Sequence, residues 1–178
     1  MATTKWIVDP LHSEIGFKIK HLMITNVKGF FNDFRIEAHT EGDDFMTAKV
    51  FAKIATKSIN TGSEDRDHHL KSPDFFDINT YPEINFMATR YEKVDRDGSY
   101  DISGDLTIKG VTHKVRFGVE FGGVMVDPWG ATKAGFTING KINRKDFGLN
   151  WNQALETGGL LVSDTVSIVC EVQLLKAL

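Results

Sequence analysis

The most polar part of the chain is residues 58–77, SINTGSEDRDHHLKSPDFFD, where acids, bases and two adjacent histidines stand together. Such a mixture raises the question of a metal site. Adjacent residues on a helix point about 100° apart, so His68 and His69 cannot easily face one ion. The four-residue histidine spacing of a zinc helix is absent, and Asp65 with His69 supplies only two ligands. We therefore expect no metal here and assign these side chains to hydrogen bonds within loops.

Other kinds of chemistry have little support in the sequence. Ser13 follows His12, and neighbours on a strand point to opposite faces, so they do not form a catalytic pair. The chain has neither a G-x-S-x-G nucleophile elbow nor a glycine-rich phosphate loop. Its single cysteine, Cys170, lies in an alternating apolar run, which favours a core thiol over a nucleophile. We expect no catalytic residues.

The charges of 58–77 are largely explained by helix ends. Thr61 and Glu64 have the spacing of a capping box, which predicts that a helix begins there. The residue before a proline avoids the helical region, so this helix should end by Ser72, which can cap a second turn starting at Pro73. Short helical turns are therefore predicted over 62–77. Their apolar side, which can roof a barrel opening, consists of Leu70, Phe75 and Phe76.

Length and composition fit one globular domain spanning residues 1–178. Hydrophobic residues make up 41% and charged residues 25% of the 178, which argues against disorder and against a membrane-spanning protein. The net charge of -3 offers no general attraction to nucleic acid or to an anionic surface. The first residues lack the apolar run of a signal peptide, which predicts a cytoplasmic protein.

Alternation of apolar and polar residues is the dominant pattern and predicts about eight antiparallel strands, each with one buried face. The clearest runs are 15–20, 48–54, 102–108, 114–121, 136–142 and 166–174. Turn signals such as Asp97-Gly98 and Lys109-Gly110 separate them. Strands of this kind must form a sandwich or close into a barrel.

Glycines inside the strand patterns favour a barrel with a hollow interior, because they allow sharp coiling or leave room beside a ligand. They are Gly16, Gly29, Gly104, Gly118, Gly135 and Gly140. A barrel of about eight strands can hold one small ligand. The alternative is a barrel packed solid by its own side chains.

Several segments together resemble the YceI-like family of lipid- or polyisoprenoid-binding, lipocalin-like proteins. The matching segments are DPLHSEIGF at 9–17 with His21, VKGFFNDF at 27–34, SINTG at 58–62, RDHHL at 66–70, SPDFFD at 72–77, Tyr81-Pro82, GDLTIKGVT at 104–112 and RKDFGLNW at 144–151. The resemblance implies an extended eight-stranded antiparallel β-barrel with a long apolar tunnel for a polyisoprenoid or another long-chain amphiphile.

We expect the tunnel wall to consist of the inward members of the alternating runs. These candidate ligand-binding residues are Phe17, Ile19, Phe31, Phe34, Val50, Ile54, Phe86, Leu106, Ile108, Val115, Phe117, Val119, Phe136, Ile138, Ile168 and Val172. A polar head group would need donors at a mouth, for which Arg66, His68 and Lys109 are the candidates.

The expected function is non-enzymatic binding, storage or transport of a long apolar lipid such as a polyisoprenoid, an isoprenoid quinone, a fatty acid or its amide. We expect no cofactor and no stable membrane insertion, and a homodimer stays open. An enzyme acting on the same lipid is one alternative, with His21, His113 or Glu120 as its acid or base. Strand parity turns Glu120 outward, whereas we expect His113 to point inward at the end of its run. A stress-related interaction protein is another. Many relatives are exported, so a periplasmic location applies if a signal peptide was removed.

Overall fold

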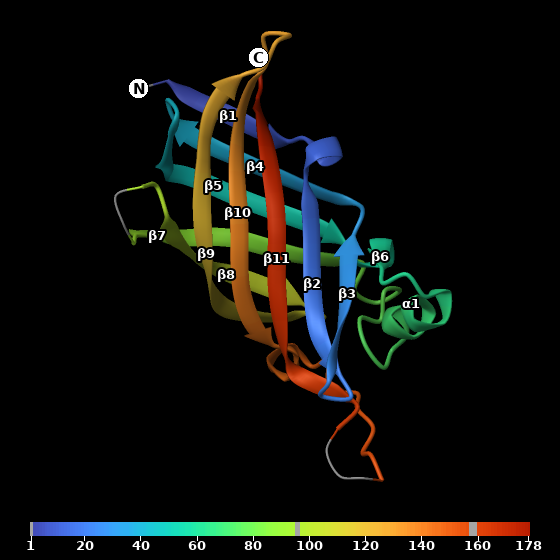
Figure 1. The fold of residues 1–178 in the computed structure, drawn as a ribbon. Helices are drawn as coiled ribbons and strands as arrows, with labels where there is room; N and C mark the ends of the chain where they lie inside the picture. Colours follow the sequence, from blue (N-terminus) through green and yellow to red (C-terminus); the bar gives the residue numbers. More distant parts are fainter. Residues whose placement is uncertain (1, 95–96, 157–159) are drawn as a thin grey trace.

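The computed structural model, which describes residues 2–94, 97–156 and 160–178, consists mainly of long antiparallel strands (Figure 1). The strands are β1 (Thr3–Val8), β2 (Glu14–His21), β3 (Thr25–Phe31), β4 (Phe34–Glu41), β5 (Asp44–Ala55), β6 (Ile59–Asn60), β7 (Glu83–Lys93), β8 (Tyr100–Ile108), β9 (Val111–Val126), β10 (Thr132–Asn143) and β11 (Val162–Lys176). One α-helix, α1 (Glu64–Lys71), and the 3-10 turns η1 (Pro10–His12), η2 (Thr56–Ser58) and η3 (Arg144–Phe147) complete the described part of the chain.

Eight of these strands close into a ring in the order β1, β4, β5, β7, β8, β9, β10, β11 and back to β1. The predicted closed antiparallel barrel is therefore confirmed. Strands β1 and β2 share β11 as a neighbour: β1 pairs with residues 174–176, and β2 pairs with residues between 162 and 171. At the β2 end the sheet continues into β3 and β6, which extends one wall past the ring.

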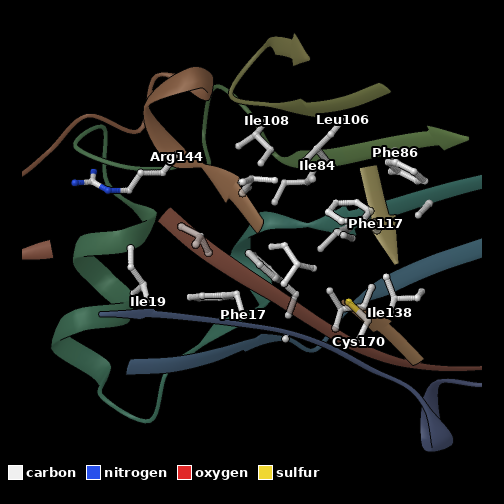
Figure 2. Close-up of a pocket in the computed structure, with 18 of the residues that line it drawn as sticks. Phe17, Ile19, Ile84, Phe86, Leu106, Ile108, Phe117, Ile138, Arg144 and Cys170 are labelled. Carbon is white, nitrogen blue, oxygen red and sulfur yellow. The ribbon is translucent and has the colours of Figure 1, made fainter. Parts of the chain in front are cut away.

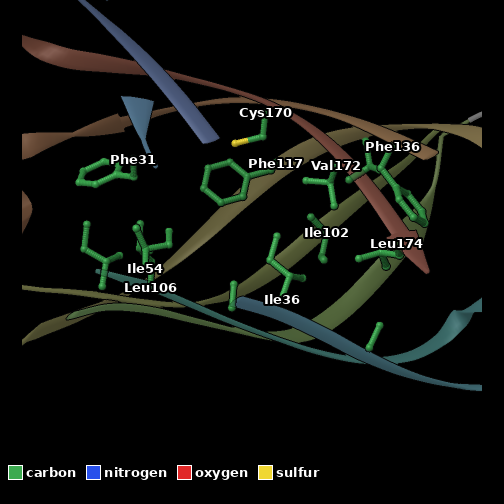
Figure 3. Close-up of a cluster of buried hydrophobic side chains, with 14 of the residues drawn as sticks. Phe31, Ile36, Ile54, Ile102, Leu106, Phe117, Phe136, Cys170, Val172 and Leu174 are labelled. Carbon is green, nitrogen blue, oxygen red and sulfur yellow. The ribbon is translucent and has the colours of Figure 1, made fainter. Parts of the chain in front are cut away.

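Burial alternates along the strands, as the sequence pattern predicts. On β8, alternate residues from Tyr100 to Ile108, Gly104 among them, are buried, while the residues between them are partly exposed. Figure 3 shows the buried cluster that results: Phe31 and Ile54 lie at one end, Phe136 and Leu174 at the other, with Phe117 between them. The inner face is therefore continuous along the barrel.

The barrel end near both termini is filled by four aromatic rings, Trp6, Phe45, Phe121 and Phe136, which we call the aromatic plug. Ring centroids are 4.9 Å apart for Trp6 and Phe45 and 4.9 Å for Phe45 and Phe136. The buried Trp6 Nε1 donates to Thr40 Oγ1 at 2.9 Å, which satisfies the one polar atom of the indole. The four rings therefore close this end of the barrel.

Helix α1 lies beside β3 and β6 at the other end of the barrel (Figure 1). The predicted capping box is wrong, because Ser63 is the N-cap and its Oγ accepts from the Arg66 amide at 3.3 Å. Gly62 adopts φ +83°, and the Thr61 hydroxyl donates instead to Asp67 Oδ1 at 2.6 Å. Ser72 ends the helix as predicted.

Residues 73–76 form a turn rather than a second helix, although the Ser72 hydroxyl accepts from the Asp74 amide at 3.3 Å. Across the described ranges, no helix combines the length and apolar character needed to span a bilayer.

Candidate binding cavity

The barrel encloses a cavity of about 550 Å³ whose wall is almost entirely apolar (Figure 2). Side chains from β2, β3, β4, β5, β7, β8, β9, β10 and β11 contribute to it, joined by α1 and the turn after it. At the aromatic plug the lining residues, including Phe45, Tyr100 and Phe136, are buried. At the α1 end Lys20, Asp65 and Arg66 line the cavity and are also exposed, so the cavity opens there. We call this end the mouth.

Most of the wall residues named from the sequence border the cavity. They are Phe17, Ile19, Phe31, Val50, Ile54, Phe86, Leu106, Ile108, Phe117, Val119, Phe136, Ile138, Ile168 and Val172. Leu70, Phe75 and Phe76, expected to roof an opening, also line it, and Phe76 packs edge-on against Phe31 with centroids 5.8 Å apart. The hollow barrel is thus present, and the solid alternative is wrong.

Phe34 and Val115 do not line the cavity, which corrects two of the proposed wall positions. Both are half-buried and pack against the core. Phe34 is the first residue of β4, at the margin of the sheet. Val115 pairs with Gly104, and the Phe86 ring lies over that glycine. The Phe86 ring therefore stands between Val115 and the cavity.

Three strand glycines leave room for aromatic rings from neighbouring strands. A Cβ on Gly29 would stand 2.3 Å from Phe17 Cζ, and one on Gly140 would stand 2.2 Å from Phe117 Cδ1. Gly104 receives Phe86 in the same way, with Cζ at 2.6 Å. These glycines were expected to coil the sheet or to border a ligand, but they accommodate rings that would otherwise fill the lumen.

The mouth is lined by a polar group of residues that the sequence identified only in part. It comprises Lys20, His21, Thr61, Asp65, Arg66, His69 and Arg144. Of the three head-group candidates, Arg66 belongs to it, with Nε donating to Thr61 Oγ1 at 2.8 Å and Nη2 donating to Thr61 O at 2.9 Å. His68 and Lys109 do not line the cavity: His68 is exposed on α1, and Lys109 Nζ donates to Pro73 O at 3.2 Å.

His69 is held rigidly at the mouth. Its Nε2 lies 2.9 Å from Asp74 Oδ2, and its ring meets the rings of Trp151 and Phe75 edge-on, with centroids 4.7 and 5.1 Å away. His69 is therefore engaged with Asp74, not with Asp65 as a second metal ligand. The part of the chain that the structure describes brings no three His, Cys, Asp or Glu side chains into a metal-binding group.

Arg144 is the most deeply buried charged residue at the mouth, with 2% of its surface exposed. Nε donates to Ser163 O at 2.9 Å, and Nη1 donates to Leu149 O at 2.6 Å and to Trp151 O at 2.8 Å. Nη2 lies 3.9 Å from Asp164 Oδ1, and within the described ranges neither atom has a hydrogen-bond partner. Burial lowers the pKa of Arg144, and nearby Asp164 opposes that shift.

The residues considered for an enzyme lie apart from one another. His21 lines the mouth, but His113, which we expected to point inward at its strand end, is exposed and packs edge-on against Phe147, with centroids 5.3 Å apart. Glu120 is exposed, as its parity predicts. Cys170 lines the cavity, and burial raises the pKa of its thiol to about 11. At neutral pH this thiol is protonated and a poor nucleophile.

Sequence reasoning missed Lys20, His69, Arg144 and Trp151 as mouth residues. The available signal was the segment 144–151, whose arginine and tryptophan stand out just beyond a strand. Their convergence with α1 depends on the closure of the barrel, which brings segments distant in sequence to one end.

A YceI-like domain model matches residues 6–174. A UPF0312 protein of Staphylococcus epidermidis is 43% identical over 164 residues, covering 92% of each chain. Among solved structures, Burkholderia cenocepacia BcnA has a TM-score of 0.80 at 21% identity, covering 93% of this chain and 98% of its own. A polyisoprenoid-binding domain from Saccharophagus degradans has a TM-score of 0.69 at 14% identity, covering 97% and 98%. The fold, the cavity and the family match together place this chain in the YceI-like family.

Proposed function

We propose that this protein binds a long-chain apolar amphiphile inside the barrel, without catalysis, and stores or carries it. The apolar cavity of about 550 Å³ with one polar mouth carries the proposal. At roughly 30 Å³ per water-sized group, that volume has room for roughly 18 methylene-sized groups. Transfer of each methylene from water contributes about 0.8 kcal/mol, so the tail supplies most of the affinity.

The apolar and polar ends of the cavity determine how the ligand is oriented. The tail points toward the aromatic plug, where the lining is apolar and buried, and the head group stays at the mouth. Four basic residues and one acid, besides the buried Arg144, meet there: Lys20, His21, Arg66 and His69 with Asp65. This excess of donors favours a head group that accepts hydrogen bonds, such as a diphosphate, a carboxylate, an amide or a quinone. An isoprenoid chain short enough for this volume would suit the tail, in keeping with the description of the Saccharophagus degradans domain as polyisoprenoid-binding.

The direct test is solvent extraction of the purified protein followed by mass spectrometry. We expect one long-chain species at about one equivalent, recovered unchanged after incubation with the protein. Absence of any such species from repeated preparations contradicts binding, and its conversion to a product supports the enzyme alternative, with His21 as the candidate that lines the cavity.

A pair of variants on β11 locates the ligand. Ile168 lines the cavity, whereas its neighbour Val169 lies on the outer face. Ile168→Trp should fill the tunnel and lower the lipid content at least about tenfold, and Val169→Trp should leave it unchanged. Equal lipid content in both variants contradicts a site in the tunnel. Phe117→Asp would be a poorer test, because this buried ring packs over Gly140 and a charge there destabilises the fold as well.

A further inference from the structure

The turn between β2 and β3 exposes three large apolar residues in succession, Leu22, Met23 and Ile24, which we call the hairpin tip. Their exposed fractions are 38%, 53% and 81%. Leu22 and Met23 also adopt φ +54° and +61°, the left-handed region that tight hairpin turns usually give to asparagine and glycine. The turn therefore accepts both backbone strain and solvent-exposed apolar surface. Neither contributes to the stability of the isolated barrel.

The hairpin tip is continuous with the mouth. The Leu22 amide donates to Leu161 O at 2.8 Å, and His21 pairs with Val162. Leu161, Val162 and His21 all line the cavity, and the neighbouring Leu160 is 39% exposed. Figure 1 shows the tip and the start of β11 at the barrel end opposite the two termini. An apolar surface thus begins where the cavity opens.

Basic residues flank this apolar surface on β2 and β3. Strands β2 and β3 contain Lys18, Lys20 and Lys28 but only one acid, Glu14, at the far end of β2. Lys18 stands directly opposite Lys28 in the ladder, an arrangement of like charges that destabilises a sheet. An external anionic surface would relieve this repulsion. The local positive charge contrasts with the net charge of -3 for the whole chain.

We propose that the hairpin tip docks on an anionic lipid bilayer, with Met23 and Ile24 entering the interface and the three lysines contacting lipid phosphates. This proposal rests on the proposed function, since an amphiphile of this kind resides in membranes and the docked mouth would face its source. The contact is peripheral and reversible, which agrees with the expectation of no stable insertion.

A second exposed apolar turn provides a matched control. Met125, near the end of β9, and Trp129, in the turn between β9 and β10, are 75% and 87% exposed at the end of the barrel that carries the termini. Asp127 lies in the same turn, and none of these three residues lines the cavity. This turn also exposes large apolar side chains, but it lies away from the mouth, and its Lys133 is paired with Asp127 at 3.4 Å.

The test is co-sedimentation of the full chain with phosphatidylcholine vesicles that contain or lack phosphatidylglycerol. We expect the wild type to bind the anionic vesicles and to release as salt is raised. Met23→Ser with Ile24→Ser, and separately Lys18→Gln with Lys28→Gln, should each weaken binding at least about tenfold. Met125→Ser with Trp129→Ser should bind as the wild type does.

Extraction of lipid from the same samples separates the two proposals, because neither Met23 nor Ile24 lines the cavity. Retained lipid without vesicle binding overturns the docking proposal alone. Vesicle binding that depends on the tip, in a protein that never yields lipid, supports docking and overturns the proposed cargo. Loss of binding in the Trp129 control, or a dimer in light scattering that Ile24→Ser dissociates, also overturns docking, the latter by making a second copy the occupant.

Discussion

The two ends of the barrel are built in opposite ways. At the aromatic plug, Trp6, Phe45 and Phe136 come from regular strands, and their positions follow from strand alternation. At the mouth, the lining comes from the end of β2, from α1 and η3, and from the segments around residues 149–151 and 161–162. The first end is closed by packed aromatic rings, while the second gathers buried and exposed donors.

The difference shows that the strands form the apolar wall of the cavity, whereas irregular segments supply most of the mouth. Alternate residues of a strand face one side, so strands readily make a continuous apolar wall. Polar groups that must converge on one point require segments whose direction the ladder does not fix. Arg144 fixes the position of such a segment at the mouth, because its guanidinium is hydrogen-bonded to the backbone of both the 149–151 segment and β11.

The strongest change to the closed end is Phe45→Ala. Phe45 and Tyr100 line the main cavity and also a second hollow of about 430 Å³ beyond the plug, so Phe45 stands between the two spaces. Removing the ring should cost about 3–5 kcal/mol of unfolding free energy. It should also let the protein retain longer tails, which mass spectrometry of the extracted lipid would detect.

Phe51→Ala is the control for this change, because Phe51 lies on the same strand with its side chain partly exposed. It should leave the length of the bound tail unchanged. If Phe45→Ala retains lipids of the same length as the wild type, the plug does not limit the tail.

The strongest change to the open end is Arg144→Met. It keeps much of the side-chain volume but leaves the carbonyls of Leu149, Trp151 and Ser163 without their donor. At about 1 kcal/mol for each carbonyl, the unfolding free energy should fall by about 3 kcal/mol in urea titrations. The neighbouring Lys145→Met should change it little, since Lys145 is exposed. Similar values for the two variants would show that Arg144 does not organise the mouth.

The rings between the two ends can be tested with Gly29→Ala. Its Cβ would overlap the Phe17 ring, which must then swing into the lumen, and we expect a loss of about 1–3 kcal/mol together with weaker lipid retention. Gly135→Ala is the control, because nothing lies within 4 Å of the Cβ it would add. Normal lipid content in Gly29→Ala would contradict the idea that Gly29 keeps the Phe17 ring out of the lumen.

The two ends also differ in how far the sequence predicts them. The alternation of strands such as β8 and β10 predicted a sheet with one buried face and most of the wall residues, because a strand exposes its pattern over many residues. The choice of a closed, hollow barrel over a sandwich or a solid barrel depended on the strand glycines and on the resemblance to the YceI-like family. The capping box at Thr61 failed because Asp67, three residues beyond Glu64, competes for the same hydroxyl. The roles of His69 and Arg144 depend on contacts across the closed barrel, and no local pattern encodes those contacts.

The smallest effect on the unfolding free energy is expected at Asp9, which follows β1 at the point where β2 replaces β1 as the neighbour of β11. Burial raises the pKa of Asp9, but His12, the Leu11 amide and Lys133 outweigh it, so the pKa lies below its ordinary value. His12 Nδ1 is 2.8 Å and Lys133 Nζ is 3.7 Å from Asp9 Oδ2. Because the folded state binds this proton less readily than the unfolded chain, the stabilisation is complete above the ordinary pKa of aspartate and is lost as pH falls through the lowered one.

Asp9→Asn should therefore lower the unfolding free energy near neutral pH and flatten its decline in acid. Urea titrations of both proteins from neutral to acidic pH would measure this. Asp43→Asn is the control, since Asp43 is exposed and pairs only with Lys176 in the described structure. If the Asp9 variant keeps the wild-type pH dependence, the junction between β1 and β2 does not depend on the charge of Asp9. Strands β1 and β2 would then be held together only by their backbone pairing with β11.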